Sequence, residues 1–153
     1  MKNLLTVTGI VLLSLIAVTG KSQALRQAKT PTFSALPNVI DCSSADLGQF
    51  FMAARGAQKV KTTIANKLNI EGNITTNVVR YSNLHSIGIT LPEFKNAVFS
   101  VSKRTDANNK IVYVGHIFPQ NSTDGYELKK TGEDTYQLIK VNMEDILPTC
   151  AQM

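Results

Sequence analysis

The hydrophobic pattern of the chain changes its period near Gly72, and this change limits the folds that the chain can adopt. Before Gly72, apolar residues recur every three or four positions, which is the spacing of one face of an amphipathic helix. After Gly72, apolar and polar residues alternate in short runs, as they do in half-buried strands. Because one helical segment is followed by a series of strands, the sequence predicts an α+β domain rather than an α/β domain.

The helical segment is expected to run from about Ser44 to Leu68. Ser43 and Ser44 offer an N-cap, and Asp46 places a negative charge in the first turn. Gly56 inside the segment lowers the stability of a helix by roughly 1 kcal/mol relative to Ala. The pattern therefore predicts one long N-terminal amphipathic helix. Its apolar stripe consists of Leu47, Phe50, Phe51, Ala54, Ala57, Val60, Ile64, Ala65 and Leu68.

Five to six antiparallel strands are expected after Gly72, and Asn142 is expected to cap a short C-terminal helix. One face of the sheet would bury the stripe of the long helix. A curved sheet wrapped around one helix, as in cystatin-like folds, is one architecture with these elements, and this analogy carries no function. The expected strands lie within residues 74–79, 87–91, 97–102, 111–118, 126–128 and 136–141.

Residues 1–24 have the three-part composition of a secretory signal peptide. Lys2 supplies a positive start, no charge occurs from Asn3 to Gly20, and the small residues Ser22 and Ala24 fit the −3 and −1 positions of a cleavage site. The alternative is an uncleaved membrane anchor, because 18 uncharged residues are at the lower limit of a membrane span. We expect cleavage after Ala24, no membrane span afterwards, and a secreted or periplasmic location.

The mature chain is expected to hold one domain. Residues 25–41 contain two prolines and little periodicity, which predicts an extended lead-in. Residues 42–150 carry the helix and the strands and are expected to form a single α+β domain. Removal of Lys2 and Lys21 with the signal leaves 14 basic residues against 11 acidic residues. This surplus is too small to indicate a nucleic-acid partner.

The two cysteines, Cys42 and Cys150, stand at the two ends of the expected domain. In an exported chain, this placement predicts one disulfide that joins the ends of the fold. Two free thiols, or a bond between two chains, are the alternatives. Neither a redox-active pair nor a metal site is expected, because the sequence lacks Cys-x-x-Cys and has no His near either cysteine.

The sequence contains no motif of a known catalytic centre. Its two histidines are His85 and His116, and neither Gly-x-Ser-x-Gly nor His-Glu-x-x-His occurs. A lone His on a strand is more often a packed residue than a catalyst. We therefore predict no catalytic residue, metal or cofactor, and we do not expect an enzyme.

One face of the expected sheet is a candidate ligand site. If the apolar side of strand 97–102 faces the helix, Ser100 and Ser102 face away from it. One face of the neighbouring strand adds His116 beside two valines. A mixture of hydroxyls, an imidazole and aliphatic groups suits a small ligand or a protein partner. The alternative is an ordinary solvated face.

These observations favour a small exported, non-enzymatic domain that binds a protein or a small ligand outside the cytoplasm. Variable loops on a stable scaffold are common binding sites, and residues 105–109 and 119–125 are the loops to consider first. One alternative is a small secreted hydrolase that uses His85 or His116 with a distant carboxylate. Another is an envelope-associated structural subunit that pairs a sheet edge with a partner strand.

Overall fold

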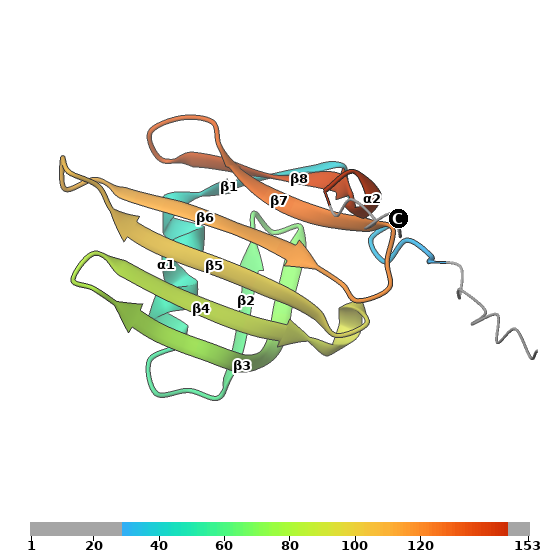
Figure 1. Ribbon diagram of the computed structural model, residues 1–153, viewed down its shortest axis with the longest axis horizontal. Coiled ribbons are helices and arrows are strands. Elements are labelled where there is room, and N and C mark those ends of the chain that lie inside the picture. Colours follow the sequence, from blue (N-terminus) through green and yellow to red (C-terminus); the bar gives the residue numbers. More distant parts are fainter. Residues whose placement is uncertain (1–28, 147–153) are drawn as a thin grey trace, which may run out of the picture.

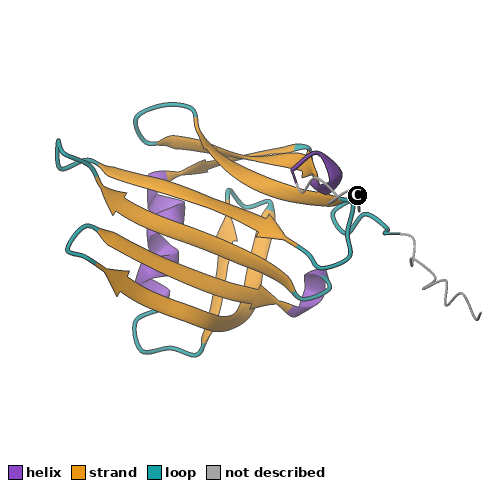
Figure 2. Ribbon diagram, in the orientation of Figure 1, coloured by secondary structure: helices purple, strands orange, loops and turns teal. Residues whose placement is uncertain are grey.

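The computed structural model describes residues 29–146, which form a mostly-β fold. Eight strands make one antiparallel sheet with the order β1-β8-β7-β6-β5-β4-β3-β2. The sheet curls into a half-barrel, and α1 crosses its concave side behind the strands (Figures 1 and 2). The elements are β1 (Val39–Ser43), α1 (Ser44–Ala53), β2 (Lys59–Ile64), β3 (Leu68–Arg80), β4 (Leu84–Leu91), the 3₁₀ helix η1 (Pro92–Phe94), β5 (Ala97–Thr105), β6 (Ile111–Phe118), β7 (Asp124–Lys130), β8 (Thr135–Asn142) and α2 (Met143–Ile146).

The path of the chain explains the position of α1. From β2 to β8, each strand pairs with the next strand along the chain, so this part of the sheet is a meander. β1 pairs instead with β8, with Val39 opposite Ile139. β1 and β2 are therefore the two edges of the sheet, and α1 carries the chain from one edge to the other.

The expected long helix is wrong. α1 ends at Ala53, and the second half of the expected segment forms β2 and the start of β3. Gly56 has a left-handed φ of 71°, which no helix accommodates. The residues after it include a β-branched run that favours a strand. A spacing of four positions puts residues on one side of a strand as well as on one side of a helix. The spacing of Val60, Ile64 and Leu68 therefore did not distinguish a strand from a helix.

The α+β class and the cystatin-like architecture are also wrong, because the structure has eight strands and one short helix across the concave face. The strands beyond the expected six are β1 and β2. The expectation of an antiparallel sheet is confirmed, and the alternating segments 87–91 and 97–102 lie in β4 and β5. The short C-terminal helix is present as α2, where the Glu144 N–H donates to Asn142 Oδ1 at 3.1 Å.

The core lies between α1 and the concave face of the sheet. The Phe50 ring of α1 meets the Phe99 ring of β5 edge-on, with ring centroids 5.0 Å apart. Burial of each large apolar side chain contributes about 1.5–3 kcal/mol to the stability of the fold. This concave face holds the alternate residues of the central strands. The buried residues from α1, β4 and β5 are Leu47, Phe50, Phe51, Ile87, Ile89, Leu91, Ala97, Phe99 and Val101.

Residues just before β1, which lie within the expected lead-in, contribute to this core. Phe33 is only 1% exposed, and its ring lies 5.2 Å from the rings of both Phe94 and Tyr126. The Asp124 carboxylate accepts hydrogen bonds from the backbone N–H groups of Thr32 and Phe33 at 2.6 and 2.9 Å. This anchoring was not visible in the sequence, because the segment has no hydrophobic period.

The expected disulfide is not supported. Cys42 lies in β1 as a free, buried thiol, and no disulfide occurs within residues 29–146. Burial, followed by the negative charges of Asp46 and Asp41, raises the pKa of this thiol to about 12. Cys150 lies outside the described residues. Backbone pairing of β1 with β8, in which Cys42 stands opposite Tyr136, already joins the beginning and the end of the sheet.

Neither helix of the described part of the chain is long and apolar enough to cross a membrane. The expected signal segment, residues 1–24, lies outside that part.

Candidate functional site

The structure brings the three expected ligand-binding residues together on the convex, outer face of the sheet. Successive side chains of a strand point to opposite faces. Ser100 and Ser102 therefore lie on the side of β5 opposite to the buried Phe99. Across the β5–β6 pair, Ser100 stands opposite His116 and Ser102 stands opposite Val114.

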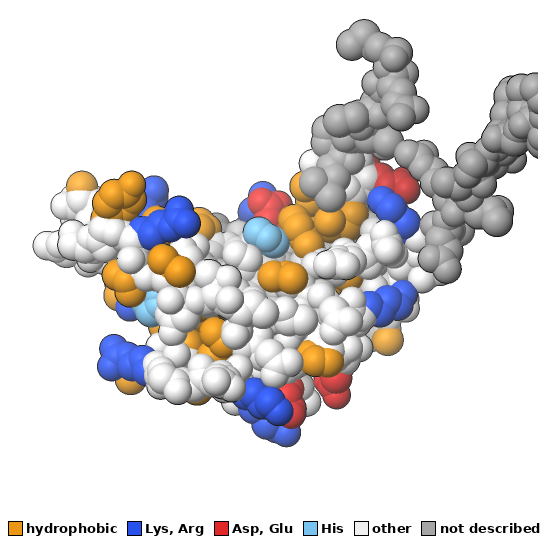
Figure 3. Space-filling model, turned by 60° about the horizontal axis from the view of Figure 1, so that its bottom comes forward, with side chains coloured by type: hydrophobic (Ala, Val, Ile, Leu, Met, Phe, Trp, Pro, Cys, Tyr) orange, Lys and Arg blue, Asp and Glu red, His pale blue; other side chains and the backbone are white. Residues whose placement is uncertain are grey.

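These residues line an open groove of about 550 Å³. On the side of the molecule shown in Figure 3, charged side chains lie mostly around the margin, and the middle holds uncharged, hydrophobic and histidine side chains. The sequence did not identify the contributions from β7 and α2, although alternation with the buried Tyr126 and Leu128 directs Glu127 outward. The lining consists of Ser100, Ser102, Val114, Gly115, His116, Phe118, Glu127, Leu128 and Ile146.

The surroundings of His116 favour the neutral form of its ring. Its ring stacks on the Phe118 ring with centroids 4.4 Å apart and an interplanar angle of 28°. Burial lowers the pKa of His116 below its ordinary value, and the opposing effect of Glu127 is smaller. A neutral imidazole offers a ligand one N–H donor and one nitrogen acceptor.

One hydroxyl group of the groove is linked to a hydroxyl of the next strand. Ser102 Oγ and Ser86 Oγ of β4 lie 2.7 Å apart and share one hydrogen bond. Gly88 stands opposite Ser100 on β4 and adds no side chain above the sheet. A β-carbon on Gly88 would lie 3.3–3.4 Å from side-chain atoms of Thr75 and Thr76, so these threonines of β3 cover the position above Gly88.

The charge at the groove is balanced. Glu127, which stands opposite His116 on β7, pairs with Lys129 two residues further along the same strand at 2.7 Å. Both side chains are partly exposed, so this ion pair adds little to stability. It nevertheless leaves the groove without an uncompensated charge.

His85 does not belong to this groove. It lies on the inner side of β4, where its Nε2 and Asn77 Oδ1 are 2.7 Å apart and its ring meets Phe51 edge-on at 4.9 Å. Burial lowers the pKa of His85, and the positive charges of Lys103 and Arg55 lower it further. The two histidines therefore occupy opposite faces of the sheet and share no site.

Other parts of the described chain do not add to the groove. Within residues 29–146, no three His, Cys, Asp or Glu side chains lie close enough to hold a metal ion. The expected binding loops, 105–109 and 119–125, follow β5 and β6, and no residue of either loop lines the groove. The candidate site is therefore built on strands.

Comparison of the chain with protein-family models, with curated proteins and with solved structures found no match. The geometry of the groove is therefore the basis of the proposal that follows.

Proposed function

We propose that the protein is an exported binding module whose outer-face groove holds a small, uncharged ligand that carries hydroxyl groups, a saccharide being the matching class. The observation that supports this proposal is the meeting of Ser100, Ser102 and His116 in one groove with apolar side chains. The signal-like composition of residues 1–24 supports a secreted or periplasmic location.

The chemistry of the lining favours an uncharged ligand. The only charged residue in the lining, Glu127, is compensated by Lys129. Hydroxyl and imidazole groups can exchange hydrogen bonds with the hydroxyls of a sugar. Val114 is 56% exposed and lies in the lining with Phe118, so the groove also offers a surface for the apolar face of a ring.

A hydrolase is the second candidate, because Ser100, His116 and Glu127 stand opposite one another on β5, β6 and β7. This is the order of a serine, histidine and acid triad. However, no hydrogen bond joins these three side chains in the described structure, and Glu127 engages Lys129. β5 pairs with a neighbour on each side, so its N–H groups are used in the sheet rather than free to stabilise an oxyanion. Binding is therefore favoured over catalysis.

The test is an NMR titration of the ¹⁵N-labelled protein with maltose, cellobiose and chitobiose in turn. We expect one of these sugars to shift amide signals of β5 and β6 around Ser100 and His116. His116→Ala and Ser100→Ala should each weaken binding about tenfold, the loss expected for about one net hydrogen bond. The control is Asn73→Ala, an exposed residue of β3 outside the groove lining, which should leave the affinity unchanged.

Two results would contradict the proposal. One is the absence of any shift with all three sugars, or shifts that His116→Ala leaves unchanged. The other is hydrolysis of p-nitrophenyl acetate that Ser100→Ala abolishes, which would establish the hydrolase instead. Thermal unfolding of each variant shows whether a loss of binding comes from a loss of structure.

A further inference from the structure

A second exposed surface, separate from the groove, lies at the end of the sheet where β3 turns into β4. We call it the end surface. Its apolar members are the most exposed large hydrophobic residues of the described chain: Tyr81 is 84% exposed, Val79 68% and Met52 63%. The end surface consists of Met52, Arg55, Val79, Arg80, Tyr81, Lys103 and Arg104.

Contacts on the inner side of the sheet hold part of this surface together. His85 stands opposite both Val79 of β3 and Lys103 of β5. Lys103 Nζ lies 5.5 Å from the centre of the Phe51 ring, which also meets His85. The end of α1 is therefore fixed against these strands. It carries Met52, next to Phe51 in the chain, at the end surface.

The hairpin tip and the outer side of the sheet complete the surface. Tyr81 occupies the β3–β4 turn with a left-handed φ of 59°, which directs the chain around the tip. Leu84 stands opposite Arg80 on one side and Arg104 on the other. The exposed aromatic ring at the tip therefore has cationic side chains on both faces of the sheet behind it.

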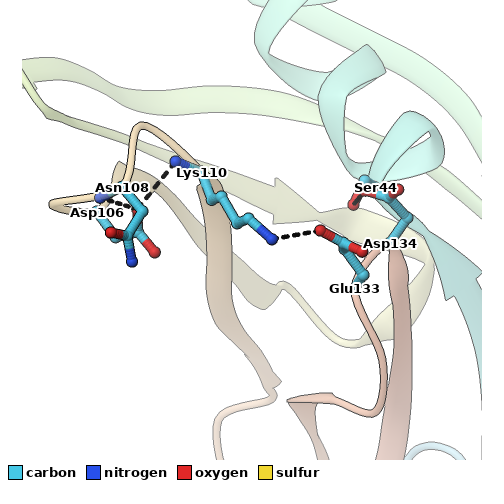
Figure 4. A network of polar contacts seen from close by, with 6 residues as sticks. All are labelled: Ser44, Asp106, Asn108, Lys110, Glu133 and Asp134. Atoms are coloured by element: carbon cyan, nitrogen blue, oxygen red, sulfur yellow. Dashed lines mark hydrogen bonds and ion pairs between the residues drawn. The ribbon is translucent and has the colours of Figure 1, made fainter.

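The four cations of the end surface have no acidic partner within residues 29–146, where the ion pairs are Lys61–Glu71, Lys110–Glu133 and Lys129–Glu127. The nearest carboxylate along the chain, Asp106, accepts hydrogen bonds from the backbone N–H groups of Asn108 and Lys110 in its own loop, and Glu133 is held by Lys110 (Figure 4). At the left of Figure 3, this end shows blue and orange side chains and no red ones.

We propose that the end surface docks onto a bilayer that contains anionic phospholipids. Cations near a membrane attract anionic headgroups, and Tyr is enriched at the interface because its ring is apolar and its hydroxyl is polar. A hairpin tip with cations on both faces of the sheet behind it presents positive charge to a flat surface from both sides. An acidic peptide lying on one face of the sheet would reach either the inner or the outer cations, but not both.

The test is sedimentation of the protein with vesicles of phosphatidylcholine alone and with vesicles that also contain phosphatidylglycerol. The exported, processed form is used, and its mass is verified, because residues 4–18 would bind lipid by themselves. We expect binding to the anionic vesicles only, and weaker binding at high salt. Arg80→Ala combined with Arg104→Ala should lower the partition coefficient about 25-fold, at roughly fivefold for each cation. Tyr81→Ala should lower it as well.

The matched control is Lys59→Ala combined with Lys67→Ala, which removes the same charge from exposed positions in β2 and in the turn after it. This variant should bind as the unchanged protein does. Equal binding to both kinds of vesicle, or an equal loss in the control, would overturn the proposal. So would capture by poly-glutamate that the arginine variant abolishes while vesicles are not bound, since the partner would then be an acidic polypeptide. Circular dichroism confirms that each variant is folded.

Discussion

Asp124 is one of two buried polar residues among those described, and its carboxylate fastens the segment before β1 to the start of β7. Its oxygens accept hydrogen bonds from the N–H groups of Thr32 and Phe33 and from Ser122 Oγ, the last at 2.7 Å. Hydrogen bonds to a charged acceptor contribute more than neutral ones. One side chain thus positions Phe33 in the core.

We predict that Asp124→Ala lowers the free energy of unfolding by about 3 kcal/mol. The two backbone N–H groups would lose a charged acceptor at a site that solvent reaches poorly. Urea unfolding followed by circular dichroism measures the change. Asp145→Ala, at an exposed carboxylate in α2, is the control and should change the free energy by less than about 0.5 kcal/mol. A loss below about 1 kcal/mol in Asp124→Ala would show that the segment is held mainly by the Phe33 ring.

Sequence alternation predicted one side of the groove and could not predict the other. It placed Ser100 and Ser102 on one face of a strand, because the side-chain period of a strand is two. The place of Glu127 beside His116 depends on the register between β6 and β7, which no pattern within either strand encodes. Ile146 reaches the groove only because α2 follows β8 at this edge of the face.

At the scale of elements, the break between α1 and β2 decides the fold class. A helix continued to Leu68 would leave the sheet without β2, and the half-barrel would be one strand narrower. Gly56 is the residue that prevents this continuation, since its φ of 71° lies in the left-handed region. A β-carbon on Gly56 would meet no atom within 4 Å, so the requirement for glycine comes from the backbone alone.

We predict that Gly56→Ala destabilises the protein by about 1–2 kcal/mol, the cost of a left-handed conformation for a residue with a β-carbon. Gly56→Asn should cost less, because Asn tolerates this region better. Thermal and urea unfolding of the two variants measure the difference. An alanine variant as stable as the unchanged protein would mean that the turn relaxes, or that the helix extends past Ala54 as the apolar spacing had indicated.

The edge strands bear on the alternative of a structural subunit that pairs strand to strand. On β2, Lys59 and Lys61 are exposed, and Lys61 pairs with Glu71 of β3 at 2.7 Å. Charged side chains, lysine above all, are common on sheet edges that stay unpaired. The β2 edge therefore disfavours strand addition.

At the scale of the whole molecule, one strand pair differs from all the others. The six pairs from β2–β3 to β7–β8 join strands that are consecutive in the chain. The β1–β8 pair joins Val39 to Ile139, across 100 positions. Forming this pair closes a loop that spans most of the domain, and closing such a loop costs chain entropy. We therefore expect the local hairpins to form before β1 docks, and we expect folding on a scale of roughly milliseconds to seconds.

Matched substitutions can test this order of events. Ile40 of β1 and Ile89 of β4 are both fully buried, and Ile→Val at either position costs about 0.5–1.5 kcal/mol. If β1 docks after the transition state, Ile40→Val accelerates unfolding and leaves the folding rate unchanged, whereas Ile89→Val slows folding. Stopped-flow chevrons in urea measure both rates. Ile40→Val could instead slow folding so much that the rise in the folding barrier equals the whole loss in the free energy of unfolding. That result would place the long-range pair in the folding nucleus, since only contacts already formed in the transition state change the folding rate.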